Sequence, residues 1–388
     1  MPDEKYIRRA RYALYALGFL FSIYSALPAY VSSSFLNQYI GESLVGMVYA
    51  AGSILTIVVF FSISAILRRF GNYRTAIGLT ILTLASTLGL AFSSHPLVIF
   101  IAFILHFSTL SLIGLTLDIF LEKTSKDSET GTVRGAYLTW ANLAWVIAPT
   151  LSAFIITRSS FSGLFAMSAF VILPILVILS LSLYRFKDPE YPTEPYFSHI
   201  KVLWKDRNMK SVFVISFLLQ FFYAWMVIYT PIYLHETIGF SWEAIGIMFS
   251  IMLIPFVILD EPLGWLADKY LGEKELLVAG FAVMGLSTIS IAFVTNDSLL
   301  IWSIILFMTR VGAATVEIMS DTYFFKKIDA SKVYLMSFYR TVRPTSYIVA
   351  PIAASLLFVA LDLKGLFVVL GILMLYGIRH SLALEDTK

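Results

Sequence analysis

Three charged residues, Arg310, Glu317 and Asp321, interrupt an apolar stretch in the second half of the sequence. Their spacings of seven and four place all three on one face of a helix. The next apolar stretch carries Arg340 and Arg343, which are three residues apart and also share a face. Charge within a membrane helix is costly, so such residues usually mark a function or a necessary pair. We expect Glu317 and Asp321 to meet Arg340 or Arg343 in one network.

This network has three interpretations. It can be a structural set of ion pairs that holds two helices together, because unpaired charges at that depth would be prohibitive. It can be a gate or a proton-coupling site, with Glu317 as the better proton carrier because it lies about one turn deeper than Asp321. Arg340 and Arg343 can instead bind an anionic substrate, since guanidinium groups match carboxylate and phosphate.

Other titratable residues form weaker patterns. Asp118, Glu122 and Arg134 are the first-half counterparts, and they form either a salt-bridge cluster at the membrane surface or part of a gate. Glu261 has either a coupling role or a proton that neutralises it against an apolar surface. His106 is either a hydrogen-bonded packing residue or a group that titrates near neutral pH. No spacing of His, Asp or Glu predicts a metal site.

Membrane helices must position these residues. Hydrophobic residues make up 59% of the 388 residues and charged residues only 14%. Apolar runs of about 20 residues recur, which is the length that crosses a bilayer core. The sequence therefore predicts an all-α membrane protein. We predict twelve spans, at residues 12–36, 44–67, 75–93, 97–121, 134–157, 163–184, 211–234, 243–267, 275–295, 298–325, 332–359 and 364–379.

Composition and motifs argue against several other classes. A net charge of +3 without a basic patch argues against a nucleic-acid partner. The absence of Cys excludes disulfides and thiolate metal sites. No Gly-x4-Gly-Lys-Ser/Thr loop is present, so ATP does not drive work within this chain. No paired catalytic residues occur in the polar loops, so we predict neither an enzyme nor a bound cofactor.

Lys and Arg placement predicts the orientation. With the N-terminus inside, the outside loops after the first, third, seventh and ninth spans contain no Lys or Arg, and the other two contain only Arg158 and Lys364. Basic residues are retained on the cytoplasmic side, so both termini and residues 185–210 are expected there. We expect an integral multi-pass protein of the prokaryotic cytoplasmic membrane.

The two halves of the sequence repeat. Pro28 and Pro231 lie near the ends of equivalent spans about 200 residues apart, and Asp118 and Asp321 are separated by the same interval. Such an interval relates whole groups of helices rather than single elements. We therefore predict two pseudo-symmetric six-helix bundles, residues 1–184 and 211–388, joined by a cytoplasmic linker at 185–210.

The hairpin between the eighth and ninth predicted spans carries a motif. Within Pro262–Lys274, PLGWLADKYLGEK, Gly264 allows a neighbouring helix to come close, and Asp268 can face the positive N-terminus of another helix. This segment resembles the helix 8–9 copy of the signature loop of the major facilitator superfamily. In the first-half copy, Ser64 replaces the usual Gly and Arg68 the usual Asp, so we expect the anionic lock only in the second half.

The resemblance implies a secondary active transporter of a small solute that works by alternating access, with a proton or another ion as coupling partner. Ala144-x3-Ala148-Pro149 resembles an antiporter motif whose glycines are replaced by small residues, which favours antiport slightly over symport. The alternatives are a transporter-fold sensor or scaffold and a membrane-embedded enzyme. We expect a monomer in the lipid bilayer.

The resemblance also implies that helices 1, 4, 7 and 10 line a central cavity, with further contacts from helix 5. The expected solute contacts, each of which can instead be a packing residue, are Tyr24, Trp140, Asn142, Gln220, Tyr223, Tyr229 and Arg310. The expected gating or coupling residues are Gly264, Asp268, Glu317, Asp321, Arg340, Arg343, Glu261, Asp118 and Arg134.

Overall fold

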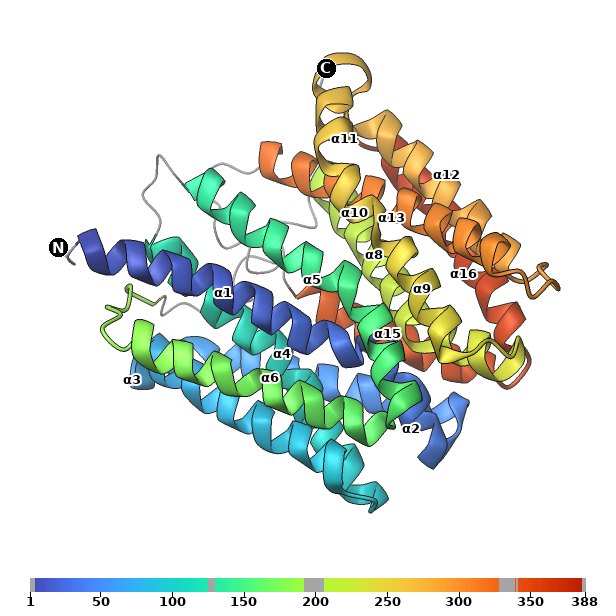
Figure 1. Ribbon diagram of the computed structural model, residues 1–388. Coiled ribbons are helices and arrows are strands. Elements are labelled where there is room, and N and C mark those ends of the chain that lie inside the picture. Colours follow the sequence, from blue (N-terminus) through green and yellow to red (C-terminus); the bar gives the residue numbers. More distant parts are fainter. Residues whose placement is uncertain (1–3, 125–129, 192–205, 328–338, 340, 386–388) are drawn as a thin grey trace. The chain divides into compact units, whose positions relative to one another are not determined.

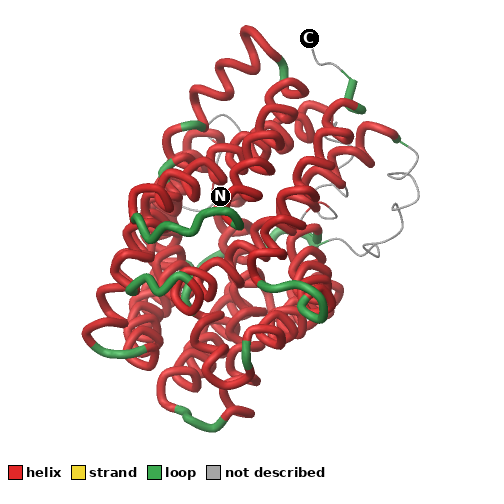
Figure 2. The backbone as a smooth tube through the Cα atoms, turned by 90° about the vertical axis from the view of Figure 1, so that its right-hand side faces the viewer, coloured by secondary structure: helices red, strands yellow, loops and turns green. Residues whose placement is uncertain are grey.

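The computed structural model describes residues 4–124, 130–191, 206–327, 339 and 341–385. All regular structure in these residues is helical (Figure 1; Figure 2). The elements are α1 (Glu4–Ala29), α2 (Ser32–Ile40), α3 (Glu42–Phe92), α4 (Pro96–Thr124), α5 (Thr130–Arg158), α6 (Phe161–Ser182), α8 (Arg207–Ile232), the π-helix η1 (Tyr233–Thr237), α9 (Trp242–Leu253), α10 (Pro255–Ile258), α11 (Asp260–Leu266), the π-helix η2 (Ala267–Leu271), α12 (Glu273–Ile291), α13 (Leu299–Lys327), α15 (Val342–Leu357) and α16 (Leu363–Leu382).

Several helices begin at a short polar side chain that caps them. Ser160, Asp206, Ser241 and Asp362 precede α6, α8, α9 and α16 respectively. Each side-chain oxygen accepts a backbone N–H from the first turn, which has no partner within its own helix. These caps explain why the helices start where they do, immediately after polar loops.

The prediction of an all-α membrane protein is confirmed. Within the described residues, nine helices are long and apolar enough to cross a membrane, or ten if the bent α9–η2 segment is one span. The 51-residue helix α3 is broken at Gly71, whose φ of 77° and ψ of 161° are not helical, so it contains two helical segments. The 16-residue helix α15 follows residues outside the described part. The exact count of twelve spans therefore stays a prediction.

The chain divides into two compact units. We call Met1–Phe35 with Ala51–Thr193 the N-terminal unit, and Leu36–Ala50 with Glu194–Lys388 the C-terminal unit. The predicted bundle limits, with a linker at 185–210, stay a prediction, since much of that linker lies outside the described residues.

The N-terminal unit is organised around α1, which packs against α5 and α6 (Figure 1). Ala10, Leu14 and Leu17 recur every three or four residues on one face of α1 and are fully buried. Phe120 of α4 and Ile172 of α6 belong to the same apolar cluster. The helix that opens the chain thus forms the centre of its unit.

The C-terminal unit is organised around α12, which packs against both α13 and α16. Glycines permit these contacts. A Cβ at Gly312 of α13 would lie 2.5 Å from the backbone nitrogen of Met284 and 2.6 Å from the carbonyl oxygen of Gly280. A Cβ at Gly371 of α16 would similarly lie 2.7 Å from the carbonyl oxygen of Gly285. The backbones approach closely because no side chain separates them, as is usual between membrane helices.

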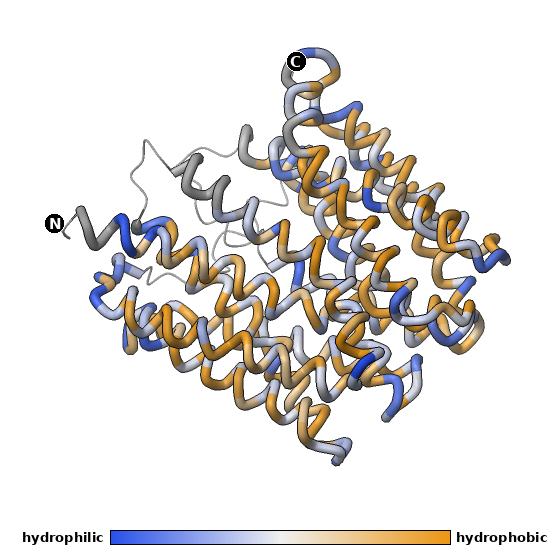
Figure 3. The backbone as a smooth tube through the Cα atoms, viewed as in Figure 1, coloured by the Kyte–Doolittle hydropathy of each residue, from blue (hydrophilic) through white to orange (hydrophobic). Residues whose placement is uncertain are grey.

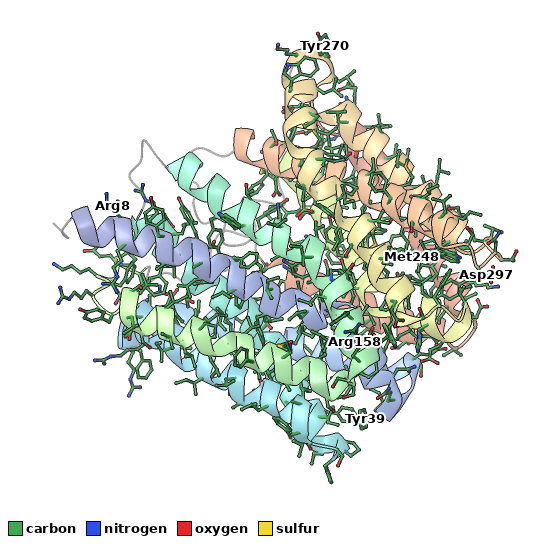
Figure 4. The ribbon with its side chains drawn as sticks, in the orientation of Figure 1. Arg8, Tyr39, Arg158, Met248, Tyr270 and Asp297 are labelled. Carbon is green, nitrogen blue, oxygen red and sulfur yellow. The ribbon has the colours of Figure 1, made fainter. Side chains whose placement is uncertain are left out.

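The outward surfaces of the helices are apolar. Figure 3 shows hydrophobic residues along the helices and hydrophilic residues near their ends. Phe92, Phe170 and Leu300 are each more than 60% exposed, which suits contact with lipid. Arg158 is the last residue of α5, and Asp297 lies in the connection between α12 and α13 (Figure 4).

We predict that Gly312→Ala destabilises the C-terminal unit by about 1–3 kcal/mol, because the added methyl group would collide with backbone atoms that cannot move independently. Gly78→Ala is the matched control, since Gly78 is helical, exposed and has nothing within 4 Å of an added Cβ. That change should be neutral or slightly stabilising. Thermal unfolding of both variants in detergent checks this, and equal effects would contradict the glycine contact.

Candidate functional site

A hydrogen bond joins α8 and α13 inside the C-terminal unit. Tyr223 Oη donates to Glu317 Oε2 at 2.6 Å, and both side chains are half-buried. An O–H···O⁻ bond of this length is charge-assisted and strong when the carboxyl is ionised. Glu317, a predicted gating or coupling residue, therefore contacts Tyr223, a predicted solute contact.

Arg310 lies against the same tyrosine. Its guanidinium carbon is 5.6 Å from the centre of the Tyr223 ring and 5.1 Å from that of Phe222. Arg310 and Glu317 are seven residues apart, or two helical turns, so both can contact α8 from one face of α13. We call Phe222, Tyr223, Arg310 and Glu317 the α8–α13 polar cluster.

The Arg310 side chain is only 1% exposed. Its Nε, Nη1 and Nη2 atoms are buried and have no hydrogen-bond partner in the described part of the chain. A desolvated cation–π contact contributes about 2 kcal/mol or more, so the two rings offset part of the cost of burying the charge. Ring faces are not oxygen acceptors, so the N–H donors stay unsatisfied within the described residues.

The other residues of the predicted α13–α15 network lie as follows. Asp321 accepts a hydrogen bond from Tyr339 Oη at 2.8 Å. Arg343 is exposed, with its guanidinium carbon 6.0 Å from the Tyr347 ring centre. Arg340 lies outside the described residues. The four-residue network therefore stays a prediction, and Tyr339 is a partner of Asp321 that sequence reasoning missed.

The second-half signature segment is helical, with a sharp turn at its end. It runs through α11 and η2 to Gly272, whose φ of 81° suits a residue without a side chain, and α12 begins at the next residue. Among the described residues, nothing lies within 4 Å of a Cβ at Gly264, so the close helix approach expected there is not observed. The side chains of Asp268 and Glu261 lie outside the description.

The first-half copy contains an unexpected carboxylate. Asp188, which follows α6, accepts the backbone N–H of Asn72 at 2.7 Å and the hydroxyl of Tyr191 at 2.5 Å. Asn72 Nδ2 in turn donates to the carbonyl of Thr116 on α4 at 3.0 Å. The helical segment that starts after Gly71 thus has an anion at its positive end. Arg68 replaces the usual Asp of the signature loop, and Asp188, which follows α6, places a carboxylate beside this loop.

Burial raises the pKa of Tyr191, and the neighbouring Asp188 carboxylate raises it further by hydrogen bonding and by its charge. The phenol therefore keeps its proton at neutral pH and remains a donor to Asp188. The Asp-Pro dipeptide, four residues beyond the end of the predicted span 163–184, indicated a turn but gave no signal for the contact with Asn72.

The glycines at the ends of the two signature segments have nearly the same backbone torsion angles. Gly71 has φ 77° and ψ 161°, and Gly272 has φ 81° and ψ 165°. Pro28 and Pro231 likewise occupy the next-to-last positions of α1 and α8. These two pairs of positions agree with the internal repeat inferred from the sequence, whose division into two six-helix bundles stays a prediction.

The N-terminal unit contains a buried polar network. Tyr24 Oη lies 2.6 Å from His106 Nδ1 and 3.1 Å from Thr87 Oγ1. The rings of Phe103 and Phe165 pack around the His106 imidazole. Tyr24 is only 1% exposed and its hydroxyl lies within this network, so its solute contact stays a prediction. His106 has the hydrogen bonds expected of the packing interpretation. An imidazole within such a hydrogen-bonded network can also exchange protons.

The remaining predicted contacts are dispersed. Tyr229 is buried beside Gly46 and Phe358 in the C-terminal unit. Trp140 is 49% exposed and packs edge-on against Phe19 in the N-terminal unit. The half-buried residues are Asn142, Gln220 and Asp118, and the Arg134 side chain lies outside the description. Among the described residues, no group of three His, Asp or Glu residues could hold a metal ion.

Comparisons with known proteins decide the family. The profile of the Major Facilitator Superfamily matches residues 12–334 and 243–383. The chain belongs to the major facilitator superfamily. No curated protein gives a match to the sequence. Among solved structures, the crystal structure of a point mutant of the nucleoside transporter NupG is similar, with a TM-score of 0.76 and 13% sequence identity over 96% of this chain and 99% of that one.

Membership of the major facilitator superfamily confirms the resemblance and the fold class predicted from the sequence. The protein is a membrane-embedded transporter. At 13% identity, the likeness to NupG shows the fold alone. The α8–α13 polar cluster, the Tyr24 network and the Asp188 contact are therefore the features of this transporter from which its own chemistry must be inferred.

We predict that Asp188→Ala destabilises the N-terminal unit by about 1–2 kcal/mol, because it removes an anion from a helix N-terminus and leaves the Asn72 N–H without its acceptor. Asp188→Asn should cost less, since the amide oxygen can still accept. The matched control is Glu190→Ala, which changes an exposed carboxylate two residues away. Thermal unfolding compares the three, and a loss no larger than that of the control would exclude the capping role.

Proposed function

We propose that this protein is a proton-coupled secondary active transporter of a small solute that works by alternating access. The observation that carries the proposal is the α8–α13 polar cluster, in which Glu317 is hydrogen-bonded to Tyr223 beside the buried cation Arg310. Ionisable residues within membrane helices commonly mark proton relays and solute pathways. Glu317 is our assigned proton carrier.

The hydrogen bond between Tyr223 and Glu317 links the protonation state of Glu317 to the contact between α8 and α13. Its titratable and charged neighbours in the described residues include Tyr223 on α8, and Arg310 and Asp321 on its own helix. An ionised Glu317 accepts a hydrogen bond from the Tyr223 hydroxyl, whereas a protonated Glu317 accepts it more weakly. Proton binding would thereby loosen the contact between α8 and α13, which is the kind of change that alternating access needs.

We propose roles in solute binding, gating or coupling for the remaining predicted residues. Solute contacts are proposed at Tyr24, Trp140, Asn142, Gln220, Tyr223, Tyr229 and Arg310. Gating or coupling roles are proposed for Asp268, Gly264, Asp321, Arg340, Arg343, Glu261, Asp118 and Arg134. The absence of a close contact at Gly264 among the described residues fits a gate that tightens in another conformation.

A weaker pattern bears on the choice between antiport and symport. The small residues Ala144 and Ala148 before Pro149 favour antiport slightly over symport. NupG is described as a nucleoside transporter, so nucleosides belong in the first panel of solutes to be tested.

A sensor that binds solute without moving it would give binding in detergent but no uptake into proteoliposomes.

We also propose that the protein resides in a prokaryotic cytoplasmic membrane as a monomer with both termini inside. The orientation is supported by the retention of Lys and Arg on one side of the predicted spans.

We predict that Glu317→Gln abolishes solute uptake driven by a pH gradient while solute binding and exchange remain, because the amide keeps a hydrogen-bonding oxygen but cannot carry a proton. Tyr223→Phe is the companion variant, which removes the hydrogen bond but leaves the carboxyl. It should shift the pH dependence of uptake without abolishing it. Uptake into proteoliposomes with and without a pH gradient measures both.

A structural role for Glu317 has a different signature. If the carboxyl only holds α8 and α13 together, Glu317→Gln should lower the melting temperature and leave the pH profile of uptake unchanged. Melting temperature and uptake are therefore measured on the same preparation, and an unchanged pH profile would remove Glu317 from the coupling mechanism.

The orientation is tested by single cysteines, which can be introduced cleanly because the chain has none. Cysteines at the exposed positions Ser94 and Asn296 should react with an impermeant thiol reagent in intact cells, and one at the exposed position Glu190 should react only after lysis. Reaction of the Glu190→Cys variant in intact cells would refute the proposed topology.

A further inference from the structure

The buried guanidinium of Arg310 requires an acceptor that the described chain does not provide. An arginine carries five N–H donors, has no acceptor and keeps its charge at every physiological pH. All three of its nitrogens are buried and without a hydrogen-bond partner in the described residues. Groups in this condition are rare in folded proteins and call for a missing water, ion or ligand.

The aromatic neighbours leave the donors free for such a ligand. Phe222 and Tyr223 contact the guanidinium at 5.1 and 5.6 Å from their ring centres, and they attract its positive charge through their ring faces. Ring faces cannot replace the oxygen acceptors that a guanidinium fork prefers. The fork matches two oxygens of one carboxylate or phosphate group, which it binds through parallel hydrogen bonds.

We propose that Arg310 anchors the anionic group of the transported solute, a small carboxylate or phosphate bound at α13 beside Phe222 and Tyr223. This assignment rests on the proposed transport function and adds the chemical class of the solute. Two hydrogen bonds from a buried cation stabilise a bound oxyanion. A neutral analogue binds more weakly, because it leaves the charge unpaired.

Tyr223 connects the anion to the rest of the cluster. Its ring contacts Arg310 while its hydroxyl binds Glu317, so one side chain touches both the proposed anion anchor and the proposed proton carrier. A ligand that shifts Arg310 therefore acts on the Glu317 hydrogen bond through a shared neighbour. This gives the solute a direct physical route to the coupling residue.

The first experiment uses the unmodified protein. Its melting temperature in detergent is measured with acetate, succinate, citrate, inorganic phosphate and glycerol phosphate, and with the neutral amides and glycerol as matched analogues. At least one oxyanion should raise the melting temperature at a concentration about 10- to 100-fold lower than its neutral analogue requires. The carboxylate and phosphate arms separate the two chemistries. If no oxyanion shifts the melting temperature more than its neutral analogue does, the proposal is overturned.

Variants locate the effect. Arg310→Gln should eliminate the oxyanion-dependent shift, and Arg310→Lys should weaken it at least about tenfold because an ammonium keeps the charge but not the fork. Arg158→Gln is the matched control, since Arg158 also lies over an aromatic ring, Phe154, but is exposed at the end of α5. Its shift should equal that of the unmodified protein. A shift that survives intact in both Arg310 variants overturns the assignment, and Arg310→Lys alone decides if Arg310→Gln does not fold.

Without ligand, the direction in which the melting temperature changes in Arg310→Met also tests the proposal. If Arg310 is reserved for a ligand, Arg310→Met should raise the melting temperature without solute, because it removes an unpaired buried cation. If Arg310 is held by the protein itself, the same change should lower the melting temperature, and that outcome counts against the proposal.

Uptake separates this inference from the proposed function. Oxyanion uptake by the unmodified protein and its loss in Arg310→Gln support both. Uptake of neutral solutes alone, with no effect of oxyanions, leaves transport standing and overturns the anion site. Oxyanion-dependent stabilisation without any uptake supports the site and overturns transport.

Discussion

The bilayer core offers no water, so every polar group that enters it must find its partner within the protein or its ligand. This constraint explains why the described chain is helical, since a helix satisfies its own backbone. It also explains the form of the polar side-chain contacts. Tyr24 with His106, and Tyr223 with Glu317, are pairs on different helices whose hydrogen-bonding groups meet inside otherwise apolar packing. Arg310 departs from this pattern in the described residues, because the neighbouring rings of Phe222 and Tyr223 compensate its charge but offer no hydrogen-bond acceptor.

The same constraint shapes the packing. Without a hydrophobic drive between helices in lipid, association depends on close van der Waals contact. In the C-terminal unit, Gly312 and Gly371 bring α13 and α16 close to the two sides of α12. These contacts hold α13 at a fixed distance from α12, and so they support the position from which Arg310 and Glu317 reach α8. The positions of Arg310 and Glu317, to which we assign solute and proton binding, thus depend on glycine contacts elsewhere on α13 and α12.

The fold was accessible from the sequence because hydropathy and charge placement are local signals. The lengths of the apolar runs predicted the helices, and the repeat that relates Pro28 to Pro231 predicted two related halves. Spacing alone placed Arg310 and Glu317 on one face of α13. Their partner could not be read in the same way, because the contact with Tyr223 depends on how α8 and α13 rotate and slide against each other. Asp188 illustrates the limit most clearly, since it meets Asn72 across 116 residues of chain and no local pattern connects them.

The Asp188 contact has a consequence for dissecting the molecule. The segment after α6 can be mistaken for a mere connection between two bundles, yet its first residues complete the N-terminal half by capping a helix of α3. A split protein, with the two halves expressed as separate chains, would need its junction beyond Tyr191 for the first chain to retain this cap. A junction at the end of α6 would remove Asp188 and Tyr191 together and leave the Gly71 turn without its anion. The boundary of the folding unit therefore lies within the polar segment and not at the last membrane-embedded residue.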